Sequence, residues 1–239
     1  MATTATSQPA PGRYVQAAAR VHTIVLLAIL AAWASLGWVM VNGMGTTTDL
    51  HRTRSYAVTL VFEWLLFTYV VGGVRRYGES ALVVLGRRWN SFRELLRDIG
   101  IAAAFWVIAA VILQVVARLL YAHTPRPNQD FLLPHNFGEL ALWIALSVSA
   151  GICEETIFRG YLQRQLAAFT KNAPAGILLS AVVFGAAHAY QGARMTVLIA
   201  VYGLLFGILA HWRGTVRPGM IAHGWQDSLN GLVGILKPH

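Results

Sequence analysis

Charge is the scarcest property of this sequence. Charged residues make up 12% of the 239 residues, whereas a soluble domain carries charge at about a quarter of its positions. Hydrophobic residues make up 56%, and the mean hydropathy is +0.53. This composition excludes a disordered chain, a collagen-like repeat and a water-facing globular surface. We therefore expect an integral membrane protein, because lipid requires no polar surface.

Cysteine and acidic residues are also scarce. The single cysteine, Cys153, excludes an internal disulfide bond, and it has no identifiable paired base that would make it a nucleophile. Ten acidic residues stand against nineteen lysines and arginines, for a net charge of +9. Such an excess is also typical of nucleic-acid-binding proteins, but here the arginines flank apolar segments, as membrane topology requires. We expect the lipid bilayer as a partner and no nucleic acid.

The apolar runs predict an all-α fold, a polytopic bundle of about seven transmembrane helices. Residues 1–20 are polar and predict a disordered tail rather than a cleaved signal peptide. The later runs approach the length of about 20 residues that spans a bilayer. They occupy residues 21–41, 56–74, 99–117, 138–166, 174–190, 195–212 and 218–236.

A basic stretch separates the second and third runs. Its apolar residues recur at helical spacing near 82–98, and arginines take the opposite face. This pattern predicts one interfacial amphipathic helix, with a basic loop as the alternative. Thirteen of the nineteen basic residues fall on the side that holds the N-terminus. The excess favours a cytoplasmic N-terminus in the plasma (inner) membrane and, with seven spans, an outer C-terminus.

The most informative segment contains two adjacent acids, Glu154 and Glu155. On a helix Glu155 and Arg159 are i,i+4 neighbours in the favourable order, so we expect Arg159 to neutralise Glu155. Glu154 points about 100° away from Glu155 and is left to face the bundle interior. An unpaired carboxylate among apolar helices suits a general base. Ser147 and Gly151, on the stripe of Glu155, predict close approach by a neighbouring helix.

Two later segments carry histidine. Phe184 and His188 share a helix face, as do His223 and Asp227. A carboxylate one turn from an imidazole can hold it in one tautomer or join it in binding a metal or water. A rise of about 1.5 Å per residue keeps these groups within the hydrocarbon, which allows them to meet in one cavity. Glu63, in the second run, is expected to be a packed, protonated acid rather than part of that cavity.

The ordered set of motifs resembles a known family. The patterns E-E-x-x-x-R, F-x-x-x-H and H-x-x-x-N/D follow one another along the chain. They resemble the CPBP family (CAAX protease and bacteriocin-processing, also called Abi) of intramembrane proteases. The resemblance lies in the helices of 138–239. Those of 21–137 resemble the family only in being apolar, and both parts are expected to form one membrane domain.

The resemblance implies an endopeptidase that hydrolyses a peptide bond of a membrane-associated peptide or protein. Carried over by position, Glu154 would activate the water with help from His188. His223 and Asp227 would stabilise the oxyanion or complete the water site. An ionised aspartate cannot donate to an oxyanion as asparagine would, so Asp227 must orient His223, be protonated or ligate a metal. The supporting residues would be Glu155, Arg159 and Phe184.

Two alternatives stay open. Glu154, His188 and His223 would supply three ligands for zinc, but they lack the H-E-x-x-H spacing, so metal-independent chemistry is favoured. The same scaffold would also suit a non-proteolytic membrane immunity or binding protein, although such a role needs no set of buried ionisable groups. A proton-coupled transporter is disfavoured because the sequence shows no inverted repeat.

Overall fold

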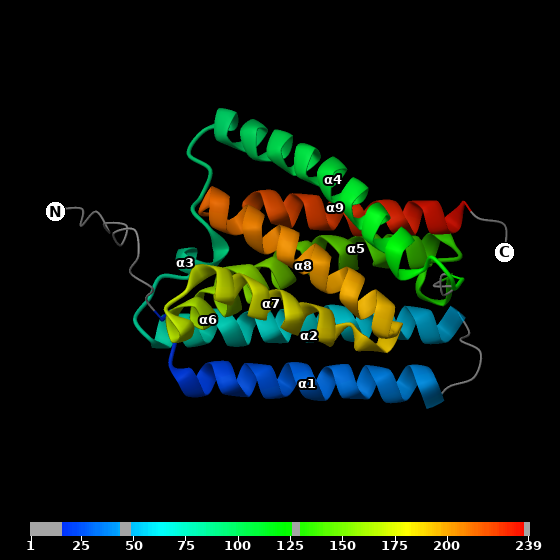
Figure 1. The fold of residues 1–239 in the computed structure, drawn as a ribbon, viewed down its shortest axis with the longest axis horizontal. Coiled ribbons are helices and arrows are strands. Elements are labelled where there is room, and N and C mark those ends of the chain that lie inside the picture. Colours follow the sequence, from blue (N-terminus) through cyan, green and yellow to red (C-terminus); the bar gives the residue numbers. More distant parts are fainter. Residues whose placement is uncertain (1–15, 44–48, 126–129, 237–239) are drawn as a thin grey trace.

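The structure, a computed structural model, describes residues 16–43, 49–125 and 130–236. No strand occurs among them, and long helices account for most of the chain, which confirms the all-α prediction. Figure 1 shows these helices side by side along the long axis of the molecule. Helix α1 (Arg20–Gly43) begins at one end, and α9 (Arg217–Ile235) finishes at the other.

Local sequence signals mark the starts of four of the remaining helices. Ser91, Asn136 and Asn172 cap three of them by accepting a backbone N–H, and prolines stand in the first turns of α7 and α9. The helices are α2 (Asp49–Arg76), α3 (Leu82–Leu85), α4 (Phe92–Leu120), α5 (Phe137–Glu154), α6 (Gln163–Thr170), α7 (Ala173–Ala187) and α8 (Ala193–Arg213). Short 3₁₀ turns are η1 (Asp130–Leu132) and η3 (Ala189–Gln191), and η2 (Glu155–Leu162) is a π-helix.

Five segments of the described chain are long and apolar enough to cross a membrane. They are Arg20–Val41, Arg52–Arg76, Phe92–Leu120, Phe137–Thr170 and Ala193–Arg213. Of the other two expected spans, α7 is apolar but has only 15 residues, and α9 is interrupted by polar side chains. Large apolar side chains are exposed along α1 and α4, as lipid contact requires. The protein is an integral membrane protein.

The predicted interfacial helix over 82–98 is wrong as a single element. The helix stops at Leu85 because Gly86 adopts a φ of +82°. A side chain on Gly86 would collide with Thr215 Oγ1, so this close approach requires glycine. Residues 86–91 are not helical. Helix α4 then starts at Phe92 and continues through the third apolar run, so the amphipathic pattern belongs to two segments that a loop separates.

The predicted disordered tail covers residues 1–20, of which residues 1–15 lie outside the described residues. Its last part is packed rather than disordered. Ala17 and Ala18 are buried, and Gln165 of α6 binds both. The Ala17 N–H donates to Gln165 Oε1 at 2.7 Å, and Gln165 Nε2 donates to the Ala18 carbonyl at 2.9 Å. The start of α1 is therefore attached to α6.

The core of the molecule surrounds the π-helix η2. All eight of its residues are buried, and several join an apolar cluster with α1 and α2. The Tyr161 hydroxyl contacts His22 Nδ1 at 2.8 Å and Thr23 Oγ1 at 2.9 Å. Sequence analysis expected one membrane span over residues 138–166. The structure instead widens one stretch of it immediately after Glu154.

Candidate active site

The predicted pair between Glu155 and Arg159 is present. Arg159 Nη1 lies 3.0 Å from Glu155 Oε1, and both side chains are buried. Arg159 Nη2 also donates to the Gly203 carbonyl at 3.2 Å. The guanidinium carbon lies 4.2 Å from the centre of the Phe184 ring, a cation–π contact. Phe184 thus supports the ion pair directly, in line with its predicted supporting position.

The two adjacent acids lie at the junction of two helix types. Glu154 is the last residue of α5, and Glu155 is the first of η2, whose wider turn changes the direction of the side chains. π-Helical turns are frequent at functional sites. The Glu155 side chain is fully buried, whereas the Glu154 side chain is 17% exposed. The predicted separation is confirmed, since Glu155 is enclosed with Arg159 and Glu154 lies outside that pair.

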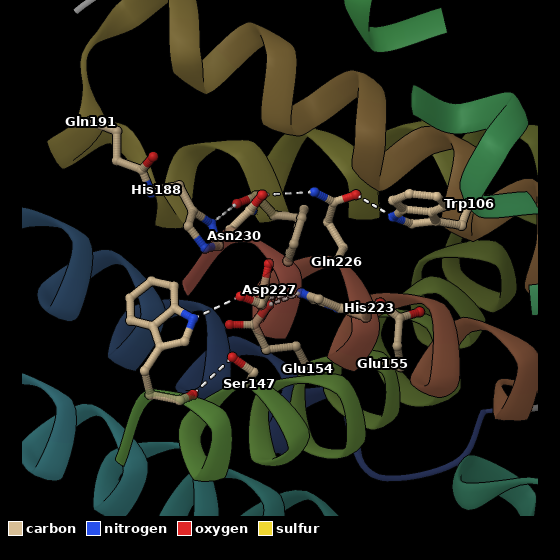
Figure 2. Close-up of polar contacts among 12 residues, drawn as sticks. Trp106, Ser147, Glu154, Glu155, His188, Gln191, His223, Gln226, Asp227 and Asn230 are labelled. Carbon is tan, nitrogen blue, oxygen red and sulfur yellow. Dashed lines mark hydrogen bonds and ion pairs between the residues drawn. The ribbon is translucent and has the colours of Figure 1, made fainter. Parts of the chain in front are cut away.

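His223 of α9 lies among three carboxylates (Figure 2). Its Nδ1 is 3.1 Å from Glu155 Oε1, and its Nε2 is 3.7 Å from Glu154 Oε2 and 3.5 Å from Asp227 Oδ2. The ring stacks on Phe206, with centroids 5.3 Å apart. The shared face of His223 and Asp227 is confirmed. Sequence reasoning missed the contact with Glu155, because it depends on how α9 is rotated against η2.

Close packing of α5 on α9 brings these groups together. A Cβ on Gly151 would lie 2.6 Å from the Met220 carbonyl oxygen and 2.9 Å from the Gly224 nitrogen. A Cβ on Gly224 would in turn meet the Ser147 carbonyl oxygen at 3.5 Å. The small residues on the Glu155 stripe do admit a neighbouring helix, as predicted. The distance from His223 to both glutamates depends on this contact.

Glu154 has a buried oxygen that forms no hydrogen bond within the described residues. This atom is Oε2, and its nearest ionic contact, His223 Nε2 at 3.7 Å, is too long for a hydrogen bond. A buried carboxylate oxygen without a donor is unfavourable, because it has lost its hydration and gained nothing in return. Such exceptions call for a functional explanation.

His188 lies at the end of α7 and is held in one tautomer. Its Nδ1 is 2.9 Å from the Phe184 carbonyl oxygen. Because a carbonyl only accepts, Nδ1 carries the hydrogen and Nε2 is left as an acceptor. The Phe184 ring centre is 4.9 Å from the His188 ring and 6.2 Å from the His223 ring. No hydrogen bond or ion pair in the described part of the chain joins His188 to Glu154.

Glu63 of α2 was expected to be a packed acid rather than a cavity residue. It is buried, and its Oε2 has no hydrogen-bond partner among the described residues. Its carboxyl group nevertheless interacts electrostatically with Glu154, His223 and Asp227. Glu63 is therefore an acidic neighbour of the site. The sequence signal was present, since Glu63 is an ionisable residue in the middle of an apolar run.

A relay of side chains that sequence reasoning missed lies beside Asp227. Trp106 of α4 donates its indole N–H to Gln226 Oε1 at 2.6 Å, and Gln226 Nε2 donates to Asn230 Oδ1 at 3.1 Å (Figure 2). Because an indole N–H only donates, both amides are oriented unambiguously. The Asn230 amide hydrogens are left directed away from Gln226. Trp143 donates to the Asp227 carbonyl at 2.7 Å.

The predicted zinc alternative does not fit the geometry. No group of three or more His, Cys, Asp or Glu side chains in the described chain is arranged to hold a metal ion. We therefore derive no reaction step through a metal.

Comparison with known proteins identifies the region that carries the site. Residues 136–229 match the family model of type II CAAX prenyl endopeptidase Rce1-like proteins. This region belongs to the CPBP family. The matched CPBP region extends from the residue that caps α5 into α9, so it includes every motif residue of the site. The match covers less than half of the chain, and at the level of the family it supports a CAAX-type intramembrane protease. No curated protein and no solved structure matches it.

Proposed function

We propose that this protein is an intramembrane endopeptidase in which Glu154 activates the attacking water. The observation that carries the proposal is Glu154 Oε2, a buried acceptor without a hydrogen-bond donor on a side chain that is 17% exposed. A water proton bound there replaces no existing hydrogen bond. Glu155, the adjacent acid, is engaged by Arg159 and His223, and is a positioning residue.

In the proposed reaction Glu154 first acts as a general base. It accepts a proton while the water oxygen attacks the carbonyl carbon of the peptide bond. It then donates that proton to the amide nitrogen as the carbon–nitrogen bond breaks, which yields a carboxylic acid and an amine and restores the carboxylate. His188 assists through Nε2, the acceptor that its hydrogen bond to Phe184 leaves available, by accepting a hydrogen bond from the second hydrogen of the water, which stays on the oxygen.

We assign the oxyanion interaction to His223. Its Nδ1 hydrogen is directed to Glu155. Its Nε2 faces Glu154 and Asp227, and a lone pair facing two carboxylates is repulsive, so Nε2 carries a proton as well. The resulting imidazolium donates to the oxygen on which negative charge develops. Asp227 only accepts when it is ionised, so it orients His223 and does not itself donate.

Asn230 is proposed to hold the main chain of the substrate. It is exposed, lies one turn beyond Asp227 on α9, and is oriented by the relay from Trp106. An extended peptide advances about 3.3 Å per residue, so a carbonyl one or two residues from the cleaved bond reaches this amide. We expect Asn230→Leu to raise KM several-fold with a smaller effect on kcat. An equal fall in kcat with unchanged KM would contradict a binding role.

The substrate class proposed is a peptide tethered to the membrane by a lipid. Glu154 lies in a segment that is long and apolar enough to cross the membrane, and a prenylated C-terminal C-a-a-X sequence is the lipidation signal that the family name describes. A suitable probe is an internally quenched, farnesylated peptide of this type, compared with the same peptide without the farnesyl group. We expect cleavage of the farnesylated peptide and little cleavage of the other.

The decisive experiment compares purified wild type with Glu154→Gln and Glu79→Gln in lipid vesicles. Both variants remove one acid, but Glu79 lies in the turn after α2, outside the site. Loss of a general base lowers the rate by about 10²–10⁴-fold, so Glu154→Gln should be nearly inactive and Glu79→Gln fully active. Undiminished cleavage by Glu154→Gln would refute the mechanism. A wild type that cleaves neither peptide would refute the substrate class.

A further inference from the structure

A second buried ionic cluster includes the first residue of α9. Helix α9 begins at one end of the bundle (Figure 1). The centre of the cluster is Asp98 of α4, a fully buried carboxylate. Arg213 Nη2 lies 3.1 Å from Asp98 Oδ1, and Arg217 Nε lies 3.2 Å from Oδ2. Trp89 donates its indole N–H to Oδ2 at 3.0 Å. The cluster therefore joins the ends of α4, α8 and α9 to the loop after α3.

The cluster has more positive charge and more donors than Asp98 can satisfy. Two guanidinium groups face one carboxylate, which leaves one positive charge in excess. Arg213 Nε and Arg217 Nη1 are buried without a hydrogen-bond acceptor in the described chain. The Arg217 side chain is only 10% exposed, so water satisfies little of it. A buried guanidinium with free N–H groups requires an acceptor of negative charge.

The surroundings add to the positive field. The two segments 86–98 and 211–217 together contain six arginines and two acidic residues. Arg87 and Arg88 are exposed on the loop, beside a Trp89 side chain that is itself 43% exposed. The Arg217 guanidinium lies over the Trp89 ring, with its carbon 5.0 Å from the ring centre. Exposed tryptophan and arginine at the end of apolar helices are typical of the headgroup layer.

We propose that Arg213 and Arg217 bind the phosphate group of an anionic phospholipid. The planar guanidinium fork matches phosphate oxygens, and a phosphate supplies the acceptors that Arg213 Nε and Arg217 Nη1 need. The Trp89 ring and the exposed apolar side chains of Phe92 and Leu96 at the start of α4 would lie along the glycerol and acyl parts. The shared chemistry is a phosphate, so free phosphate is the other source. This site is separate from the proposed hydrolysis and does not depend on it.

The test is native mass spectrometry of the purified protein in neutral detergent with three probes. They are phosphatidylglycerol, phosphatidylcholine with the same acyl chains, and inorganic phosphate. We expect phosphatidylglycerol to bind at least tenfold more tightly than phosphatidylcholine. Binding of inorganic phosphate as tight as that of phosphatidylglycerol would support the phosphate site but assign it to free phosphate. Equal binding of the two lipids, with no binding of phosphate, would overturn the proposal.

Variants separate the site from the overall charge. The double variant Asp98→Asn with Arg217→Gln keeps the net charge of the protein, and it does not leave a buried carboxylate that has lost its arginine. We expect this variant to bind phosphatidylglycerol at least tenfold more weakly. Arg118→Gln removes one exposed positive charge at the other end of α4, and it should bind as wild type does. Arg217→Lys, which keeps the charge without the fork, should bind several-fold more weakly. Undiminished binding by the double variant would overturn the proposal, whereas a loss in Arg118→Gln of equal size would reduce it to a charge effect.

Discussion

Two buried clusters of arginine and carboxylate share helix α9 but differ in the sign of their excess charge. Near the middle of the helix bundle, one arginine and one histidine stand against three acids, because Arg159 pairs with Glu155 alone and His223 contacts all three. At the start of α9 one acid, Asp98, meets two arginines. Buried charge is tolerated only with partners, and each cluster leaves atoms without them. The acid-rich cluster lacks donors and suits a water molecule, whereas the arginine-rich cluster lacks acceptors and suits an anion.

The largest expected difference between the two clusters is in the free energy of unfolding that is lost when an arginine is replaced. Arg159→Met leaves the fully buried Glu155 without its cation, and removing one partner of a buried pair costs about 3–5 kcal/mol. Arg217→Met leaves Asp98 with Arg213 and Trp89, so we expect a loss of only about 1 kcal/mol. Denaturant unfolding in micelles measures both. Equal losses would mean that the two clusters do not differ in how their acids are satisfied.

The acids should show the reverse contrast in stability. Asp98→Asn removes the charge that two arginines share, and we expect it to lower the free energy of unfolding by about 2–3 kcal/mol. Glu154→Gln should change it by less than about 0.5 kcal/mol, because Oε2 makes no hydrogen bond that would be lost. The same unfolding experiment applies. A large loss in Glu154→Gln would show that this carboxylate has a structural role.

Helix packing provides a smaller effect. Gly151→Ala places a methyl group against the Met220 carbonyl and forces α5 away from α9, which should cost about 1–2 kcal/mol and reduce cleavage. Gly100 of α4 is the matched control, because nothing lies within 4 Å of its Cβ position. Gly100→Ala should be neutral or stabilising by up to about 1 kcal/mol. A Gly151→Ala protein as stable and active as wild type would contradict the importance of this contact.

The smallest effect is expected at Asp227. Its side chain is 33% exposed and 3.5 Å from His223 Nε2, so solvent screens much of the interaction. Asp227→Asn keeps an oxygen that accepts from His223, and kcat/KM should change by less than about tenfold, which corresponds to about 1.4 kcal/mol. Steady-state kinetics on the farnesylated peptide measures this change. A loss as large as that of Glu154→Gln would assign Asp227 a direct part in the chemistry.

Much of the active-site cluster was predictable from the sequence, because it rests on local spacing. The Glu155–Arg159 pair follows from i,i+4 neighbours, and the approach of α9 follows from the small residues that precede the acids. The π-helix was not predictable, since over eight residues its side-chain pattern does not differ enough from that of an α-helix. The contact of His223 with Glu155 depends on helix rotation, and the assigned roles of the motif residues stay predictions.

The arginine-rich cluster escaped sequence analysis for a different reason. Arg213 and Asp98 are 115 positions apart, so no local pattern links them. The arginines around residue 90 were interpreted instead as one face of a helix. Gly86 breaks that helix, and the break turns Trp89 toward Asp98. The tertiary contact between Trp89 and Asp98 therefore decides the local structure, although the sequence pattern separates apolar from basic residues.

The spacing of the two clusters along α9 sets the depth at which the proposed cleavage takes place. Arg217 opens the helix, and His223 follows six residues later, a rise of about 9 Å. With Arg217 at the level of the lipid phosphates, the bond to be cut lies about three residues of extended peptide below that level. A substrate must therefore bring its cleavable bond at least this far inward, which favours a peptide whose own lipid inserts into the bilayer over one that is held at the surface.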